Sequence, residues 1–159
     1  MAQNAALYFN GSRIDALPPR PEGRGLRAEF LVKLTLVQGL LLATITIRHH
    51  DRCTMVENMV VDTGSAHTWV NVNAVEGELD LTPDGADEIV TAFGIGGRDV
   101  AVRKTIDEIT FDSFHARAFS IDVGSLGPGL CGLIGLDLLL AGQFLSDCNA
   151  LELRRANHS

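Results

Sequence analysis

The most informative stretch of the sequence is Val60-Val61-Asp62-Thr63-Gly64-Ser65. Two valines of an expected strand bring one carboxylate to a dry position, where a charge is costly unless it is hydrogen-bonded or paired. Thr63 and Ser65 supply hydroxyl groups, and Gly64 lets the backbone turn tightly. The combination favours a site that holds an aspartate over a segment that packs a core. The triplet alone is weak support, because Asp-Thr-Gly is also ordinary turn chemistry.

Two further segments add weight to this interpretation. The first is Phe93-Gly94-Ile95-Gly96-Gly97, a glycine-rich tip between extended segments, which predicts a mobile hairpin. It is not a dinucleotide-binding motif, because the G-x-G-x-x-G spacing is missing and no helical pattern follows. The second segment is 132–139, in which an apolar strand reaches Gly135 and continues into a helix predicted over 136–141. Gly142 is placed to end that helix.

Short strands account for most of the remaining chain. Apolar alternation and β-branched residues predict strands at 30–37, 41–48, 53–61, 89–93, 99–105, 109–111, 116–122 and 151–153. The first three indicate a β-meander. Residues 74–88 carry six acidic and no basic side chains, which predicts a solvated acidic loop or, alternatively, a rim that favours basic substrates. Together with one short C-terminal helix, these strands predict an all-β fold, a small closed barrel.

Length and composition are those of one globular domain. The chain has 159 residues, 46% of them hydrophobic, and its net charge of −7 argues against nucleic acid as a partner. Residues 1–28 are rich in proline, glycine and arginine and predict an N-terminal arm or pro-segment before a domain at 29–159. No signal peptide is evident, and the most apolar stretch, 40–47, is too short to cross a bilayer. We therefore expect a cytoplasmic protein without a membrane span.

Several residues outside these motifs suggest other roles. His49, His50 and Asp51 are adjacent, but neighbouring side chains at a strand end point to opposite sides and no third ligand is spaced with them, so we expect no metal and no cofactor. Asp137 is interpreted as a helix N-terminal acid or a member of an ion pair. Trp69 is expected to anchor the core or a cleft wall. The three cysteines lack C-x-x-C spacing, which predicts buried free thiols.

The order of the motifs resembles the retropepsin-like aspartic proteases, the family of the retroviral proteases and their cellular relatives. That family has an apolar pair before D-[ST]-G, then a glycine-rich flap, then an apolar-apolar-Gly strand before a short helix. This chain has V-V-D-T-G-S, G-I-G-G and L-I-G in the same order, and the resemblance covers roughly residues 40–154. Ser65 is the choice of pepsins, and Asp137 stands where retroviral enzymes often have a basic or amide residue. Both differences favour a cellular or bacterial member.

The resemblance implies an aspartic endopeptidase and assigns roles to its motifs. The residues implied are the catalytic Asp62, Thr63 and Gly64, the supporting Ser65, Ile134 and Gly135, and the flap Phe93, Gly94, Ile95, Gly96 and Gly97. No metal or other cofactor is implied. The substrate would be an extended peptide or protein, attacked by a water between two carboxylates that share one proton.

The resemblance also implies a homodimer, because the sequence contains Asp-Thr-Gly once. The second carboxylate would come from Asp62 of another copy, across a two-fold axis formed by the triplet and by terminal strands at 30–37 and 151–153. Two other interpretations stay open. The chain could be a catalytically silent module of this fold, used for dimerisation or peptide binding, or an unrelated β-barrel with a chance Asp-Thr-Gly.

Overall fold

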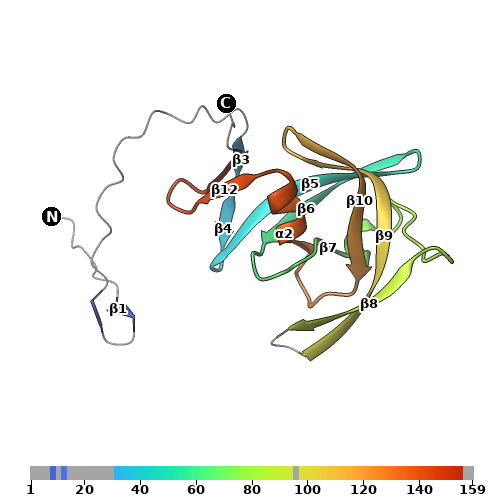
Figure 1. Ribbon diagram of the computed structural model, residues 1–159, viewed down its shortest axis with the longest axis horizontal. Helices are drawn as coiled ribbons and strands as arrows, with labels where there is room; N and C mark the ends of the chain where they lie inside the picture. Colours follow the sequence, from blue (N-terminus) through green and yellow to red (C-terminus); the bar gives the residue numbers. More distant parts are fainter. Residues whose placement is uncertain (1–7, 10–11, 14–30, 95–96, 156–159) are drawn as a thin grey trace.

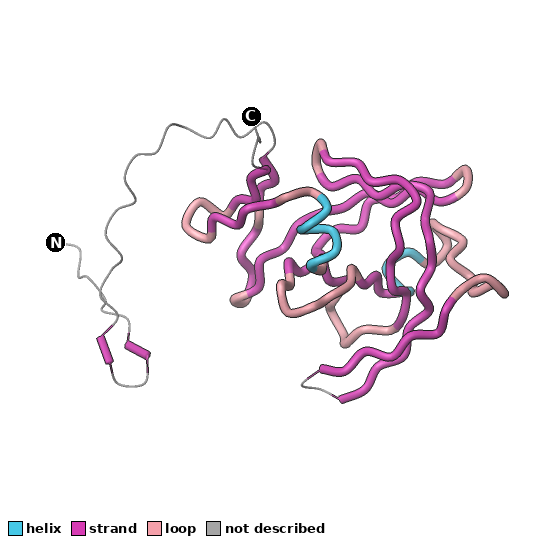
Figure 2. The backbone as a smooth tube through the Cα atoms, in the orientation of Figure 1, coloured by secondary structure: helices cyan, strands magenta, loops and turns pink. Residues whose placement is uncertain are grey.

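The computed structural model describes residues 8–9, 12–13, 31–94 and 97–155, which contain thirteen strands and two short helices. The strands are β1 (Tyr8–Phe9), β2 (Ser12–Arg13), β3 (Leu31–Lys33), β4 (Thr35–Val37), β5 (Leu40–His49), β6 (Arg52–Val61), β7 (Trp69–Asn71), β8 (Glu88–Gly94), β9 (Gly97–Phe111), β10 (Phe114–Gly124), β11 (Gly132–Ile134), β12 (Phe144–Asp147) and β13 (Glu152–Arg155). The helices are α1 (Val72–Val75) and α2 (Leu136–Ala141). The expectation of an all-β fold is confirmed (Figures 1 and 2).

The core lies under one eight-stranded sheet in the order β4-β5-β6-β11-β7-β10-β9-β8, and β5 also pairs with β9. Alternate residues of the long strands point inward, as the two-residue period of a strand requires. Ile45 and Ile47 of β5 and Ile109 and Phe111 of β9 are thus almost completely buried. The predicted meander is present as β4-β5-β6. Full closure of the barrel stays a prediction.

Two parts of the predicted strand pattern are divided differently in the structure. The strands expected at 99–105 and 109–111 are parts of one strand, β9. The polar residues between them do not interrupt the strand, because they alternate with buried residues: Asp107 is exposed, whereas Ile106 beside it is buried. The strand expected at 30–37 is divided into β3 and β4 at Leu34, whose N–H donates to the carbonyl oxygen of Leu151 (2.9 Å). The predicted helix at 136–141 is confirmed as α2. Helix α1 is an addition that the sequence did not predict.

A second, three-stranded sheet joins the two ends of the described domain, in the order β12-β13-β3 (Figure 1). Its central strand, β13, is the strand predicted at 151–153, and β12 was not predicted. Lys33 and Glu152 form an ion pair across it. The expected arm at 1–28 lies outside the described residues, apart from β1 and β2, which pair with each other.

Two smaller expectations concern the cysteines and the membrane. The three cysteines are free, as predicted, but Cys53 and Cys148 are exposed, so their expected burial is wrong. Neither α1 nor α2 is long and apolar enough to cross a membrane, and these are the helices of the described residues.

Candidate active-site turn

The Asp62 side chain lies in the turn that follows β6. Strand β11 runs parallel to β6, and the Asp62 N–H donates to the carbonyl oxygen of Ile134 at its end (3.0 Å). Within the turn the Gly64 N–H donates to Asp62 Oδ1 (2.8 Å), and the Ser65 N–H donates to the Asp62 carbonyl oxygen (3.2 Å). Asp62 is half-buried, whereas Thr63 and Gly64 are exposed. The turn therefore holds one carboxylate oxygen against its own backbone at the surface of the molecule.

Strand β11 braces both sides of this turn. It lies between β6 and β7, parallel to the first and antiparallel to the second. The strand before Asp62 and the strand after the turn therefore share one central partner. Ile134 is fully buried there. The Leu-Ile-Gly segment is thus a structural support of the turn.

Position 135 has no room for a side chain, because the backbone of the turn passes directly over it. A Cβ atom at this position would lie 2.4 Å from the carbonyl carbon of His67, 2.5 Å from its oxygen and 2.8 Å from the nitrogen of Thr68. Real Cβ atoms do not approach backbone atoms this closely, since carbon contacts are favourable only near 3.5–4.0 Å. The turn is also tied to the helix by the Leu136 N–H, which donates to the Ser65 carbonyl oxygen (2.9 Å).

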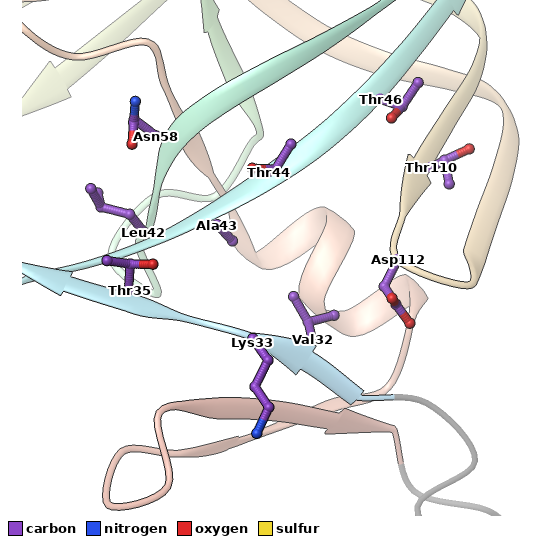
Figure 3. A pocket seen from close by; sticks show the side chains of 10 residues that line it. All are labelled: Val32, Lys33, Thr35, Leu42, Ala43, Thr44, Thr46, Asn58, Thr110 and Asp112. Atoms are coloured by element: carbon purple, nitrogen blue, oxygen red, sulfur yellow. The ribbon is translucent and has the colours of Figure 1, made fainter.

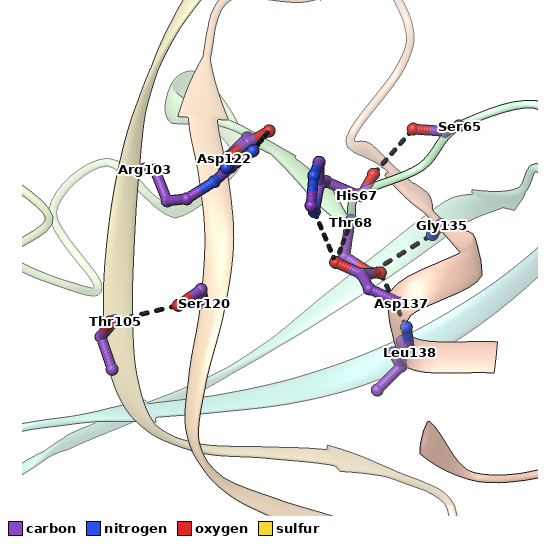
Figure 4. A network of polar contacts seen from close by, with 10 residues as sticks. All are labelled: Ser65, His67, Thr68, Arg103, Thr105, Ser120, Asp122, Gly135, Asp137 and Leu138. Carbon is purple, nitrogen blue, oxygen red and sulfur yellow. Dashed lines mark hydrogen bonds and ion pairs between the residues drawn. The ribbon is translucent and has the colours of Figure 1, made fainter. Parts of the chain in front are cut away.

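Asp137 and Thr68 join the turn to α2 through side chains (Figure 4). Asp137 accepts the Thr68 N–H at Oδ2 (2.8 Å) and the Thr68 hydroxyl at Oδ1 (2.7 Å). His67 Nδ1 lies 3.5 Å from Asp137 Oδ2. Both interpretations of Asp137 were therefore incomplete: it is in the first turn of α2, but its bonds reach across to the end of the turn that carries Asp62. Thr68 carried no recognisable signal in the sequence.

A part-buried ion pair connects Thr68 with the strand that continues from the glycine-rich hairpin. Arg103 of β9 donates through Nε (2.8 Å) and Nη2 (3.0 Å) to the two carboxylate oxygens of Asp122 in β10. These bonds raise the pKa of Arg103 above its ordinary value. The Asp122 N–H in turn donates to the Thr68 carbonyl oxygen (2.9 Å). The end of the turn is thus held from both α2 and β10.

The predicted flap residues lie at the tip of the β8–β9 hairpin. Phe93 pairs with Arg98, and Gly94 pairs with Gly97; Ile95 and Gly96 are outside the described residues. The Phe93 side chain is 82% exposed. The arm carries further exposed apolar side chains at Ile89 and Val100. Its function as a flap stays a prediction.

The acidic segment before this hairpin is more ordered than the expected solvated loop. Leu79 and Leu81 are buried in the core. Lys104, itself 4% exposed, donates through Nζ to Asp87 (2.7 Å) and Asp84 (3.1 Å). Burial alone would lower the pKa of Lys104, but its bonds to Asp87 and Asp84 outweigh burial and raise it. A buried lysine therefore anchors the segment that leads into β8.

His49 and His50 lie on the same side, so the expectation that they point apart is wrong. Their rings are stacked with centroids 4.1 Å apart, because His50 has a left-handed backbone (φ 52°) at the turn after β5. Neither ring nitrogen of the buried His49 has a hydrogen-bond partner among the described residues. Burial and the neighbouring His50 lower the pKa of His49, with Asp107 opposing them.

A pocket of about 360 Å³ lies away from the predicted site, between β5 and the strands β3 and β4 (Figure 3). Its lining is mostly polar: Val32, Lys33, Thr35, Leu42, Ala43, Thr44, Thr46, Asn58, Thr110 and Asp112. None of the predicted catalytic or flap residues is among them. The pocket therefore adds nothing to the chemistry of Asp62.

The structure thus brings together Asp62, Thr63, Gly64 and Ser65 with Ile134 and Gly135, the residues predicted for one half of an active site. A comparison with curated proteins finds no match. A family model described as aspartyl protease matches residues 45–138, which is more than half of the chain and includes the turn, the β8–β9 hairpin and Gly135. The chain therefore belongs to the aspartyl protease family.

Proposed function

We propose that this chain is a retropepsin-like aspartic endopeptidase whose active site forms between two copies. The observation that carries the proposal is the Asp62 carboxylate itself. One of its oxygens accepts the Gly64 N–H (2.8 Å), and this is the one hydrogen bond that the described residues give to the carboxylate. The second oxygen is available to a water or to a partner group. The triplet occurs once in the sequence, so one chain supplies half of the pair that the reaction requires.

Two carboxylates that face each other cannot both be ionised without strong repulsion, so the pair holds one proton between them. The ionised member would remove a proton from the attacking water, and the protonated member would polarise the carbonyl of the scissile bond. Neither role belongs to a fixed copy, because the pair titrates as a unit. The Thr63 hydroxyl, exposed next to Asp62, is proposed to bond across the two-fold axis.

Exposed apolar side chains support contact with a second copy. Leu31 of β3 and Leu145 of β12 are exposed on the terminal sheet, and Leu36, Val37 and Leu40 are exposed on the β4–β5 hairpin. Such groupings on a surface mark contact sites more often than isolated residues do. We propose that these strands and the Asp62 turn form the dimer contact. The β8–β9 arm would close over a substrate bound as an added strand.

The first test is peptide cleavage. Purified protein is incubated with a diverse peptide mixture between about pH 4 and pH 7, where such carboxylate pairs act, and products are identified by mass spectrometry. We expect cleavage that the Asp62→Asn variant lacks. Cleavage that survives in this variant removes Asp62 from the mechanism, and no cleavage at any pH favours the silent binding module.

The second test concerns the shared site. Wild-type protein is mixed with increasing amounts of the Asp62→Asn variant and left to exchange subunits. Because a mixed dimer would carry one intact carboxylate, activity per wild-type chain should fall as the variant is added. Constant activity per wild-type chain would show that each copy works alone. Sedimentation velocity on the same samples measures whether dimers are present.

We also propose that residues 1–28 precede a protease domain at 29–159 and are removed by self-cleavage. The contrast in composition between the two parts motivates this proposal. Intact-mass measurement of wild-type protein and of the Asp62→Asn variant after the same incubation tests it. Identical N-termini in both would end the idea.

A further inference from the structure

The Asp137 carboxylate makes more contacts than a residue in the first turn of a short helix needs. It is bonded to both the N–H and the hydroxyl of Thr68, at 2.8 Å and 2.7 Å. The Leu138 N–H also donates to Oδ1 (2.7 Å). Thr68 is fully buried, and its hydroxyl oxygen accepts the Gly135 N–H (3.2 Å). The two side chains form a closed set of bonds between α2 and the end of the active-site turn (Figure 4).

Helix capping does not account for this arrangement. The N-cap residue of α2 is Gly135, which offers no side-chain cap, and the helix has only six residues. Asp137 makes one bond to its own helix and two to Thr68, which is 69 residues away in sequence. A buried threonine with both polar groups held by one carboxylate is fixed in position and orientation.

The position of Thr68 matters because it ends the turn that carries Asp62. The beginning of that turn is held by the backbone of Ile134, and its middle by two N–H groups of α2, from Leu136 to Ser65 and from Asp137 to Ala66. The far end is held to the helix by the Asp137 side chain. The Ser65 hydroxyl adds an internal bond to the His67 carbonyl oxygen (2.7 Å).

A carboxylate suits this site better than an amide. Both oxygens accept: Oδ1 takes the Thr68 hydroxyl and the Leu138 N–H, and Oδ2 takes the Thr68 N–H. An asparagine has one acceptor oxygen, so its NH₂ group would face an N–H donor on one side or the other. His67 Nδ1 also lies close to this carboxylate, 3.5 Å from Oδ2.

We infer that Asp137 is a positioning residue, which acts through Thr68 to hold the turn so that Asp62 faces the second carboxylate of the proposed dimer. The inference rests on the proposed function. Loss of this restraint shifts the turn without removing a reacting group or a substrate contact. Misplacement by about 1 Å lowers reaction rates by about 100-fold. The expected effect is therefore a fall of kcat by roughly tenfold to 100-fold, with KM changed by less than about threefold.

The test compares five proteins: wild type, Asp137→Asn, Thr68→Val, the double variant Asp137→Asn/Thr68→Val, and Thr68→Ser. Thr68→Val removes the hydroxyl at nearly constant shape, and Thr68→Ser keeps it. We expect Asp137→Asn and Thr68→Val each to lower kcat, and the double variant to be little worse than either, because both remove the same restraint. Thr68→Ser should recover most of the kcat that Thr68→Val loses.

A matched control is available in the acidic segment. Asp80 also accepts the N–H (3.2 Å) and the hydroxyl (2.6 Å) of a threonine, Thr82, but it does so at an exposed position and with both bonds at Oδ1, which an asparagine can keep. Asp80→Asn should leave kcat within about twofold of wild type, as expected for a surface substitution. An equal loss in Asp80→Asn and Asp137→Asn would overturn the inference, since the effect would then not depend on the turn.

Hydrogen exchange provides a readout that does not need activity. Asp137→Asn and Thr68→Val should speed exchange of backbone amides in residues 62–70 by about tenfold or more, whereas amides in β5 and β9 should be unchanged. Unchanged exchange in 62–70, or an equal increase throughout the chain, overturns the positioning role. If wild-type protein cleaves no peptide, the proposed function fails, while exchange still decides the role of Asp137. If wild type cleaves and kcat is unaffected in both variants, only the inference fails.

Discussion

The substitution Gly135→Ala tests how tightly the turn lies against β11. Three backbone atoms of His67 and Thr68 lie 2.4, 2.5 and 2.8 Å from the position of the new Cβ. Backbone atoms cannot rotate away as the end of a side chain can, so the peptide must move by roughly 1 Å to reach a normal contact near 3.5 Å. Overpacking of this kind costs about 1–3 kcal/mol.

The Gly135 N–H adds a second destabilising effect, because it donates to the Thr68 hydroxyl oxygen (3.2 Å). Displacing the turn weakens this bond, which is worth about 1 kcal/mol. Alanine also restricts the unfolded chain, which offsets about 0.4–1 kcal/mol of the loss. The three effects together predict that the free energy of unfolding falls by about 1–3.6 kcal/mol.

Urea unfolding followed by the fluorescence of the single tryptophan measures this change. Trp69 is 4% exposed and directly follows the turn, so its emission reports unfolding of the region concerned. Protein concentration is held constant, because association would otherwise shift the apparent stability. The control is Gly127→Ala, where no atom lies within 4 Å of a new Cβ. It should leave the free energy of unfolding unchanged or raise it by up to about 1 kcal/mol, because only the restriction of the unfolded chain applies there. Equal changes in the two variants would refute the proposed close contact.

Two further predictions concern Lys104, next to the base of the β8–β9 hairpin, and His49, at the end of β5. Lys104→Met should lower the free energy of unfolding by about 3 kcal/mol, because it removes one partner of a buried ion pair and leaves the Asp87 carboxylate without its cation. Urea unfolding measures the loss, and an equal loss in Arg98→Met, at an exposed arginine, would contradict this reason. The pKa of His49 is lowered by burial and by His50, so the folded state binds fewer protons than the unfolded state below about pH 6.5, and stability should decrease as pH falls from there toward the lowered pKa. His49→Phe should flatten that part of the profile of stability against pH, and an unchanged slope would remove His49 from the explanation.

The parts of the fold that were predictable are those with a local signal. Helix α2 was predicted at both ends, because a run of leucines follows one glycine and precedes another. The long strands followed from β-branched and alternating residues. Helix α1 and strand β12 have four residues each, too few to show a period. The pairing of β3 with β13 joins opposite ends of the domain, and no local pattern contains that information.

The site shows the same division between local and non-local signals. Asp62 and Gly135 were predicted because each stands in a short motif of its own. The bond between Asp137 and Thr68 spans 69 residues, and neither residue has an unusual neighbour in sequence. The stack of His49 on His50 depends on one left-handed backbone angle at a non-glycine residue. Patterns of apolar residues carry no signal for such an angle.

The placement of α2 links the turn that carries Asp62 to the proposed dimer contact. Its first turn holds Thr68 through Asp137, and the chain leaves its other end at Gly142 to enter β12 of the terminal sheet. Phe144 of β12 packs edge-on against the rings of Phe111 and Phe114, with centroids 5.1 and 5.8 Å away, so the terminal sheet is fixed to the core at the point where α2 ends. In a dimer built on the terminal sheet, α2 would therefore connect the contact with the second copy directly to the turn that carries Asp62. A substitution that loosens the terminal sheet should therefore lower kcat as well as weaken the dimer, because a helix of six residues transmits a displacement at one end to the other.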